Sequence, residues 1–167
     1  MRGDAPSWAT YSDCDRYRYA LTRCWDPGGA ALLYILLNPS KATEIDNDPT
    51  VERCERRARA LGFGAFRVTN IFAWRDTDPR ALRQAQAPVG PQNDEILRDS
   101  LASADLVIAG WGAHGAHRDR GSAVALLLKA SGVPIHHLGL TKDGHPRHPL
   151  YIAYRHRPVL WDTLAEG

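Results

Sequence analysis

The stretch Tyr34-Ile35-Leu36-Leu37-Asn38-Pro39-Ser40-Lys41-Ala42 decides the fold that this chain of 167 residues is expected to adopt. The run from Ala31 to Leu37 is apolar or aromatic and carries no charge, which is typical of a strand buried on both faces of a sheet. It stops at Asn-Pro-Ser, because proline cannot continue a β-ladder and Asn and Ser favour turns. Open α/β sheets bind ligands outside the carboxyl ends of their strands, so Asn38 is a candidate for chemistry. Its side chain could also simply close the turn.

The chain alternates predicted strands with predicted helices, which favours a mostly parallel sheet covered by helices on both faces. Besides residues 31–37, we expect strands over residues 65–72, 105–110 and 133–138, and helices over residues 51–61, 92–104 and 121–131. We therefore predict a single three-layer α/β/α domain over residues 16–167, with a central, mostly parallel sheet of four to five strands.

The N-terminal part is expected to add an antiparallel edge strand to this sheet. Residues 16–23 alternate polar with apolar or aromatic side chains, and the turn signal Asp26-Pro27-Gly28-Gly29 follows, which predicts a hairpin or an edge strand before the buried strand. Residues 1–15 are predicted to form a poorly ordered lead-in. Residues 76–91 contain three prolines and are predicted to form a loop with one short turn.

The composition indicates an ordinary globular protein and decides little about its partner. The net charge is +2, and 24% of the residues are charged, which favours neither a nucleic acid nor a small anion. No apolar run approaches the roughly 18 residues of a membrane span, and no signal peptide is recognisable, so we expect a cytoplasmic protein without a membrane partner. Cys14, Cys24 and Cys54 lack CxxC spacing, so we expect reduced thiols rather than a metal cluster or disulfides.

Polar or small residues lie at the ends of four predicted strands, namely Asn38, Asn70, Trp111-Gly112 and the loop that contains His148. In a parallel sheet these strand ends meet at one edge, where Asn and His side chains can orient water, recognise a planar ring or stabilise developing charge. Each also has a structural alternative, because Asn70 could cap a turn, His148 could stabilise its loop and Trp111 could be a core residue. The chain contains no GxGxxG, GxxxxGKS or GxSxG motif, which argues against dinucleotide, P-loop and nucleophile-elbow sites.

The helix expected over residues 51–61 has both a start signal and a basic face. Asp48 is a favoured N-cap residue, and the proline after it fits the first helical position. Arg53, Arg56 and Arg57 share one face of this helix. That face is either a solvated surface or a patch that binds phosphates.

Two groups of residues offer metal binding as an alternative. Asp46 and Asp48 could be paired carboxylates for Mg²⁺, although the helix-cap interpretation of Asp48 is favoured. His114, His117 and Asp119 have a spacing that is compatible with a metal, but no further pair of ligands accompanies them.

Several short motifs together resemble the family catalogued as domain of unknown function 1643. They are Leu37-Asn38-Pro39-Ser40, the Asn-Asp-Pro-Thr of residues 47–50, Asn70-Ile71-Phe72, Trp111-Gly112 and His148-Pro149-Leu150-Tyr151. The resemblance covers roughly residues 16–160 and implies no settled activity.

A more distant likeness points to a chemistry. The order of the motifs is similar to that of the uracil-DNA glycosylase superfamily, especially its mismatch-specific branch. There a strand ends in a Gly-x-Asn-Pro turn whose Asn positions the attacking water, and Asn38-Pro39 matches this turn, with Leu36 in place of the Gly. A second strand ends in an Asn that recognises the base edge, which matches Asn70. A late His-Pro-Ser loop supplies a histidine near the glycosidic bond and a wedge, and His148-Pro149 matches it with Leu150 in place of Ser.

This likeness implies a metal-independent hydrolase, related to DNA repair glycosylases, that cleaves the N-glycosidic bond of a nucleobase in DNA or in a nucleotide. Asn38 and His148 are the candidate catalytic residues, and no cofactor is expected. The candidate substrate-binding residues are Pro39, Ser40, Asp48, Asn70, Phe72, Trp111, Gly112 and Tyr151, and those for a nucleic-acid backbone are Arg53, Arg56, Arg147 and Arg155.

Two alternatives belong to other functional classes. One is a non-catalytic module that binds a nucleotide or a nucleic acid at the same edge of the sheet. The other is a metal-dependent phosphodiesterase that uses Asp46, Asp48 and His117.

Overall fold

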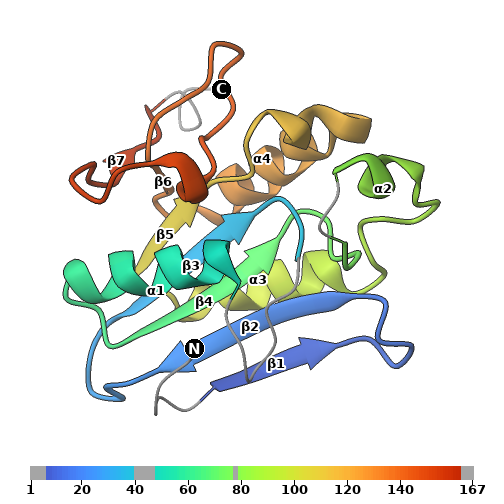
Figure 1. Ribbon diagram of the computed structural model, residues 1–167. Coiled ribbons are helices and arrows are strands. Elements are labelled where there is room, and N and C mark those ends of the chain that lie inside the picture. The colour runs from blue at the N-terminus through green and yellow to red at the C-terminus, as the bar shows by residue number, and fades with distance from the viewer. Residues whose placement is uncertain (1–6, 40–47, 77–78, 163–167) are drawn as a thin grey trace.

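A computed structural model describes residues 7–39, 48–76 and 79–162, whose strands form one seven-stranded sheet (Figure 1). The order across the sheet is β1 (Ser7–Tyr11), β2 (Arg18–Cys24), β4 (Ala65–Asn70), β3 (Ala31–Leu36), β5 (Leu106–Ala109), β6 (His136–His137) and β7 (Val159–Leu160). The four central strands, β4, β3, β5 and β6, run parallel, and the flanking strands pair antiparallel with their neighbours. The predicted α/β class is confirmed.

The predicted helices are present with small shifts at their ends. They are α1 (Pro49–Ala60), α3 (Asn93–Ser103) and α4 (Arg120–Ser131), and the loop predicted over residues 76–91 contains the short helix α2 (Pro79–Gln84). The 3₁₀ helices η1 (Ala113–Asp119) and η2 (Pro149–Tyr151) complete the elements. No helix in the described part of the chain is both long and apolar enough to cross a lipid bilayer.

The start of α1 confirms the capping signal at Asp48. Its Oδ1 accepts a hydrogen bond of 2.8 Å from the backbone N–H of Val51, and Pro49 occupies the first turn, where it sacrifices no helical hydrogen bond. The helix ends before Gly62, whose φ of +87° is the left-handed conformation that glycine adopts most easily.

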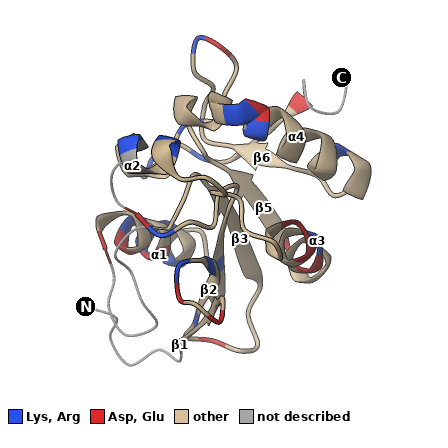
Figure 2. Cartoon of the chain, turned by 90° about the vertical axis from the view of Figure 1, so that its right-hand side faces the viewer, with Lys and Arg blue, Asp and Glu red and all other residues tan. Residues whose placement is uncertain are grey.

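Strand β3 is apolar throughout because both of its faces are covered. Leu32, Tyr34 and Leu36 belong to a hydrophobic cluster with residues of α1, whereas the alternate residues Leu33 and Ile35 belong to a second cluster with residues of α3 and α4. In Figure 2, α1 and α3 accordingly lie on opposite sides of the sheet.

The edges of the sheet differ from the prediction. Strand β2 does not form a hairpin with β3, because β4 lies between them and Leu21 of β2 is opposite Val68 of β4. Residues 7–11, which we placed in a poorly ordered lead-in, form β1 outside β2, so the predicted edge strand is an inner one. The seven strands exceed the expected four to five because β1 and β7 extend the two edges.

The order of the parallel strands fixes where a ligand can bind. The chain passes from β3 through α1 to β4 on one side, and then crosses through α3 to β5 on the other side of β3. Ligands of open α/β sheets bind where the order reverses in this way, outside the carboxyl ends of the strands. This crevice lies at the ends of β3 and β5.

Arg57 joins α1 to the segment after η2 through buried hydrogen bonds. Its side chain is 2% exposed and donates to the backbone oxygens of Ile152 at 2.9 Å and His156 at 2.9 Å. Arg56, its neighbour on the same helix, is exposed and pairs with Glu52 at 2.9 Å. Arg57 is therefore a buried link between two segments, whereas Arg56 is a surface residue.

We expect Arg57→Ala to lower the free energy of unfolding by about 2–4 kcal/mol, because buried carbonyl oxygens lose a charged donor. Arg56→Ala should leave the unfolding curve unchanged, since an exposed ion pair contributes little. Urea denaturation followed by circular dichroism measures both variants. Equal effects of the two substitutions would show that Arg57 does not anchor the segment.

Candidate functional site

A pocket of about 640 Å³ lies at the carboxyl ends of β3, β4 and β5. Its wall brings together most of the residues that the sequence analysis singled out, from segments far apart in the chain, namely Asn38, Asp48, Asn70, Trp111, Gly112, Arg147, His148 and Tyr151. The volume is in the range of pockets that bind small molecules.

Other predicted residues lie outside the wall of this pocket. Phe72 is fully buried in the hydrophobic core, and Pro39 is also buried. Arg53 donates hydrogen bonds to the backbone oxygens of Pro149 and Ile152, and Arg56 and Arg155 are exposed. Ser40 and Asp46 lie outside the described residues.

Asn70 presents the most unusual polar group of the pocket. It is 1% exposed, and neither Nδ2 nor Oδ1 has a hydrogen-bond partner among the described residues. A buried polar group without a partner costs about 1–3 kcal/mol, so such groups call for a specific reason. Because its amide makes no hydrogen bond to the described residues of the turn after β4, the alternative that Asn70 caps a turn is wrong, and both polar atoms are available to a ligand.

The backbone around Asn70 is held rigidly by a second buried amide. Nδ2 of Asn93 donates to the backbone oxygens of Asn70 at 2.8 Å and Ile71 at 3.1 Å. Nε of Arg120 donates to the same Ile71 oxygen at 2.7 Å. The Asn70 amide therefore projects from a fixed main chain, which favours a preorganised contact.

Asn38 closes its turn and still offers an acceptor. Its Nδ2 donates to the backbone oxygens of Asp76 at 2.5 Å and Pro39 at 3.3 Å. Both interactions use Nδ2, so the alternative that Asn38 closes its turn is correct for the NH₂ group of the amide. The carbonyl Oδ1 is the atom that Asn38 can offer to a water molecule or to a ligand hydroxyl.

His148 is held as a neutral ring. Its Nδ1 accepts a hydrogen bond of 3.3 Å from the backbone N–H of Leu150 at the start of η2, so the ring proton of the neutral form lies on Nε2. Burial lowers the pKa of His148 from 6.5 to about 4, although the nearby charge of Asp48 acts in the opposite direction. The side chain therefore both stabilises its loop and presents an N–H donor at neutral pH.

The loop that carries His148 lies directly against the end of β5. A Cβ atom at Gly110 would lie 2.9 Å from Cδ of Pro149, so only glycine permits this approach without a shift. The N–H of Gly112, whose φ is +73°, donates to the oxygen of Pro146 at 2.8 Å. We had singled out Gly112, whereas Gly110 looked like an ordinary end of a strand.

Two charged residues of the pocket wall escaped the sequence analysis. Arg18 of β2 is 2% exposed, and its burial lowers its pKa to about 10 while the charge of Asp48 raises it. Asp76 also lines the pocket, after β4. In the alternating pattern of residues 16–23, Arg18 occupies a position expected on the solvent face of the strand. The pattern therefore did not predict its burial.

The aromatic residues divide between the floor and the rim of the pocket. Trp111 is 2% exposed and packs against Trp161 with a centroid distance of 5.6 Å, which confirms that it belongs to the core and the pocket wall. Tyr151 is 82% exposed, and its ring centroid lies 6.3 Å from that of His148.

Two of the residues proposed for a phosphodiesterase, Asp48 and His117, do not come together, and the third, Asp46, lies outside the described residues. Asp48 lines the pocket as the cap of α1, whereas His117 lies outside the wall, with its ring packed against Phe72 at a centroid distance of 5.7 Å. Across the described ranges, no three His, Cys, Asp or Glu side chains are placed to hold a metal ion.

Asn70 and Asn93 give a matched pair of variants. Asn70→Leu should leave the free energy of unfolding unchanged or raise it by up to about 1–3 kcal/mol, because it removes buried groups that lack partners. Asn93→Leu should lower it by about 1–3 kcal/mol, because the buried oxygen of Asn70 loses the amide donor and that of Ile71 keeps only Arg120. Urea denaturation compares the two variants, and an equal loss in both would contradict the assignment of Asn70 to a ligand.

The pKa of His148 predicts a stability that depends on pH. The folded state holds the ring neutral down to about pH 4, whereas the unfolded chain takes up the proton near 6.5, so acidification across this interval favours unfolding. The contribution is complete above pH 6.5 and falls by up to about 3 kcal/mol by pH 4. His148→Asn keeps an acceptor for Leu150 and should lose this component, which urea denaturation at several pH values will reveal. A wild type and variant with parallel pH curves would contradict the lowered pKa.

Comparisons with known proteins identify a family and leave the activity open. No curated protein and no solved structure matches the chain. The family described as "Protein of unknown function (DUF1643)" matches residues 18–150, which is well over half of the 167 residues. This confirms the first resemblance seen in the sequence, and the likeness to glycosylases stays a prediction. The chain therefore belongs to the DUF1643 family.

Proposed function

We propose that this protein hydrolyses the N-glycosidic bond between a nucleobase and its sugar, in DNA or in a nucleotide. The observation that carries the proposal is the buried amide of Asn70, which lacks partners in the described chain and shares one pocket with Asn38 and His148. An amide offers a donor beside an acceptor, which is the hydrogen-bonding pattern needed to pair with the edge of a nucleobase.

The reaction requires a water molecule, an acceptor to orient it and a donor for the departing base. The glycosidic bond breaks with its electron pair going to the base, which leaves an oxocarbenium-like sugar that water attacks at the same carbon. In the proposed arrangement, Oδ1 of Asn38 accepts a hydrogen bond from this water and fixes its position. The proton that the water loses finally balances the charge of the released base.

His148 would act on the departing base as a neutral donor. Because its Nδ1 is used by Leu150, the hydrogen on Nε2 can point at an oxygen or nitrogen of the base on which negative charge develops. Its lowered pKa keeps the ring uncharged at neutral pH, so the interaction is a hydrogen bond rather than an ion pair. Hydrogen-bond donors that are fixed before the reaction stabilise such charge without reorganisation.

The proposal predicts that Asn38→Ala lowers the rate of base release by about 10²–10³-fold, because the water is no longer oriented. Chromatography of the bases released from DNA containing uracil, hypoxanthine or a mismatched thymine, and from the corresponding nucleotides, measures this rate. Arg98→Ala, an exposed change on α3, is the control and should leave the rate unchanged.

The same assay, repeated with EDTA, separates the proposal from its alternatives. Activity that survives EDTA and is lost in Asn38→Ala supports the glycosidase. Loss of activity with EDTA would instead indicate a metal-dependent phosphodiesterase. Binding without turnover would identify a non-catalytic module.

A further inference from the structure

The groups at the pocket follow one another along the edge of the sheet. Asn70 ends β4, Asn38 follows β3, Gly112 follows β5, and a hairpin of residues 139–147 follows β6. Neighbouring strands are about 4.8 Å apart, so three strand spacings separate Asn70 from this hairpin by roughly 14 Å. That span is comparable with a nucleoside monophosphate measured from the edge of its base to its phosphate.

The hairpin of residues 139–147 carries a cation and a hydroxyl group into the pocket wall. The N–H of Thr141 donates to the oxygen of His145 at 2.7 Å, and the N–H of Arg147 donates to the oxygen of Gly139 at 2.9 Å. Thr141 and Arg147 both line the pocket. Because Gly112 binds the oxygen of Pro146, the hairpin is attached to the end of β5.

The side chain of Arg147 is placed by a glycine and keeps donors for a ligand. A Cβ atom at Gly139 would lie 3.3 Å from Cδ of Arg147, so the side chain extends over this glycine. Its Nε donates to the oxygen of Leu140 at 3.4 Å, which leaves the terminal amino groups as donors. Within residues 7–39, 48–76 and 79–162, no carboxylate forms an ion pair with Arg147.

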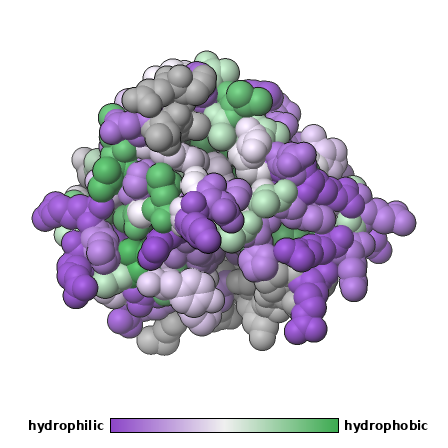
Figure 3. All heavy atoms as spheres, turned by 90° about the horizontal axis from the view of Figure 1, so that it is seen from above, coloured by the Kyte–Doolittle hydropathy of each residue, from purple (hydrophilic) through white to green (hydrophobic). Residues whose placement is uncertain are grey.

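The arginines of α1, by contrast, are engaged within the chain and do not form a track for a polynucleotide. Arg53 and Arg57 donate to backbone oxygens of the segment after η2, as described above. Arg56 pairs with Glu52, and Arg59 pairs with Glu55 at 3.3 Å and lies over the ring of Trp25. In Figure 2, basic and acidic residues are intermixed on α1 and α3, and Figure 3 likewise shows hydrophilic side chains spread over the face seen from above.

We propose that the ligand of this pocket is a free nucleoside phosphate rather than a nucleic acid. Its base lies at Asn70, and its phosphate lies at the hairpin, where Arg147 supplies charged N–H donors. The Thr141 hydroxyl, whose oxygen accepts from the N–H of His145 at 3.1 Å, supplies a neutral O–H donor. The assignment of the base end rests on the proposed function, whereas the assignment of the phosphate end rests on the hairpin alone. A pocket of about 640 Å³ has room for such a ligand.

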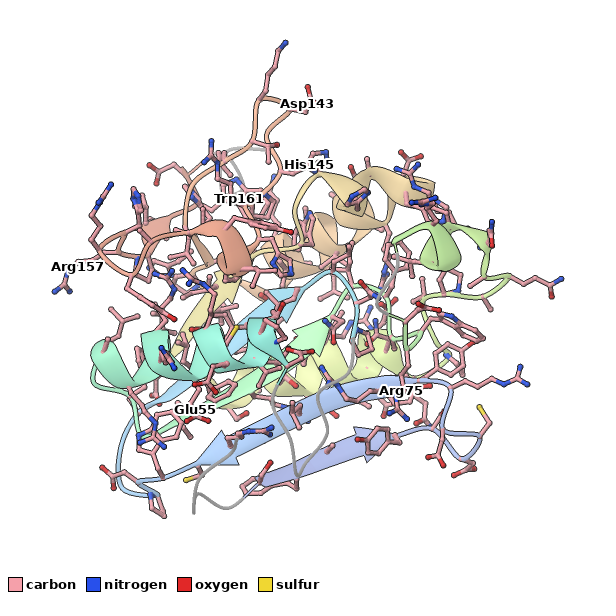
Figure 4. The ribbon with its side chains drawn as sticks, in the orientation of Figure 1. Glu55, Arg75, Asp143, His145, Arg157 and Trp161 are labelled. Atoms are coloured by element: carbon pink, nitrogen blue, oxygen red, sulfur yellow. The ribbon has the colours of Figure 1, made fainter. Side chains whose placement is uncertain are left out.

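The test compares the binding of a base as its nucleoside monophosphate, as its nucleoside and within an oligonucleotide. Deoxyuridine 5′-monophosphate, deoxyuridine and a single-stranded oligonucleotide containing uracil are offered to the wild type, with inosine 5′-monophosphate and inosine as a second pair. Binding is measured by calorimetry, and base release by chromatography. Arg147→Ala, Arg147→Lys and Arg157→Ala are compared, because Arg157 points away from the sheet in Figure 4 and does not line the pocket.

The wild type should bind at least one monophosphate more tightly than its nucleoside. Arg147→Ala should weaken binding of the monophosphate about ten- to hundredfold and that of the nucleoside by less than about twofold. Arg147→Lys should restore part of the affinity, and Arg157→Ala should match the wild type. An equal effect of Arg147→Ala on monophosphate and nucleoside would overturn the proposal, as would binding of the oligonucleotide alone.

The result also separates this inference from the proposed function. Monophosphate binding that depends on Arg147, without release of any base, would support the ligand and refute the glycosidase. Base release from the oligonucleotide but from no monophosphate, with loss of activity in Asn38→Ala, would support the glycosidase and refute the ligand. Failure of every probe to bind would refute both.

Discussion

The structure depends on hydrogen bonding along both edges of one buried strand. Strand β3 is parallel to β4 on one side and to β5 on the other, and its ladder continues past the last strand residues. The N–H of Ile71 donates to Leu36 and that of Phe72 to Leu37, while the N–H of Gly110 donates to Ile35. A register shift of one residue would turn each apolar side chain to the wrong face, so these bonds fix which residues reach the end of the sheet together.

The polar end of the sheet is built by a different set of forces from those that build its core. Removal of apolar side chains from water drives the packing of β3. Removal of the Asn70 amide and of the Arg18 guanidinium from water is unfavourable, yet both are buried. Asn93 and Arg120 compensate by donating hydrogen bonds to the main-chain oxygens of Asn70 and Ile71. The pocket is therefore a region in which the fold tolerates unfavourable burial, as functional sites commonly do.

The central part of the fold was predictable from the sequence because its signals are local. The apolar run before Asn38, the cap at Asp48 and the glycines after helices each act within a few residues, and all appear in the structure. Strand β1 was missed because its five residues pair only with β2 and none of them is buried. Strand β6 is shorter than predicted because Pro134 lacks an N–H, and pairing with β5 begins at His136.

The pocket was predictable only in part, for a related reason. The carboxyl ends of parallel strands share an edge in any such sheet, so Asn38, Asn70 and the residues after β5 could be placed together. The partners of individual arginines depend on distant backbone oxygens, so the sequence suggested a shared phosphate patch for Arg53 and Arg56. The burial of Arg18 was likewise unpredictable, because it depends on which distant segments pack over the start of β2 and not on the alternation of residues within the strand.

The close contact between Gly110 and the loop of His148 has a consequence for how this family can diversify. The width of the pocket at that point is set by the bare Cα of Gly110 against the ring of Pro149 and the backbone oxygen of Arg147, so no flexible side chain sets it. Relatives that keep the glycine would retain the same spacing between sheet and imidazole, whatever molecule they accommodate. Changes of preference during evolution would then arise at the amide end or on the outer hairpin, where residues such as Asn70 and Arg147 line the pocket.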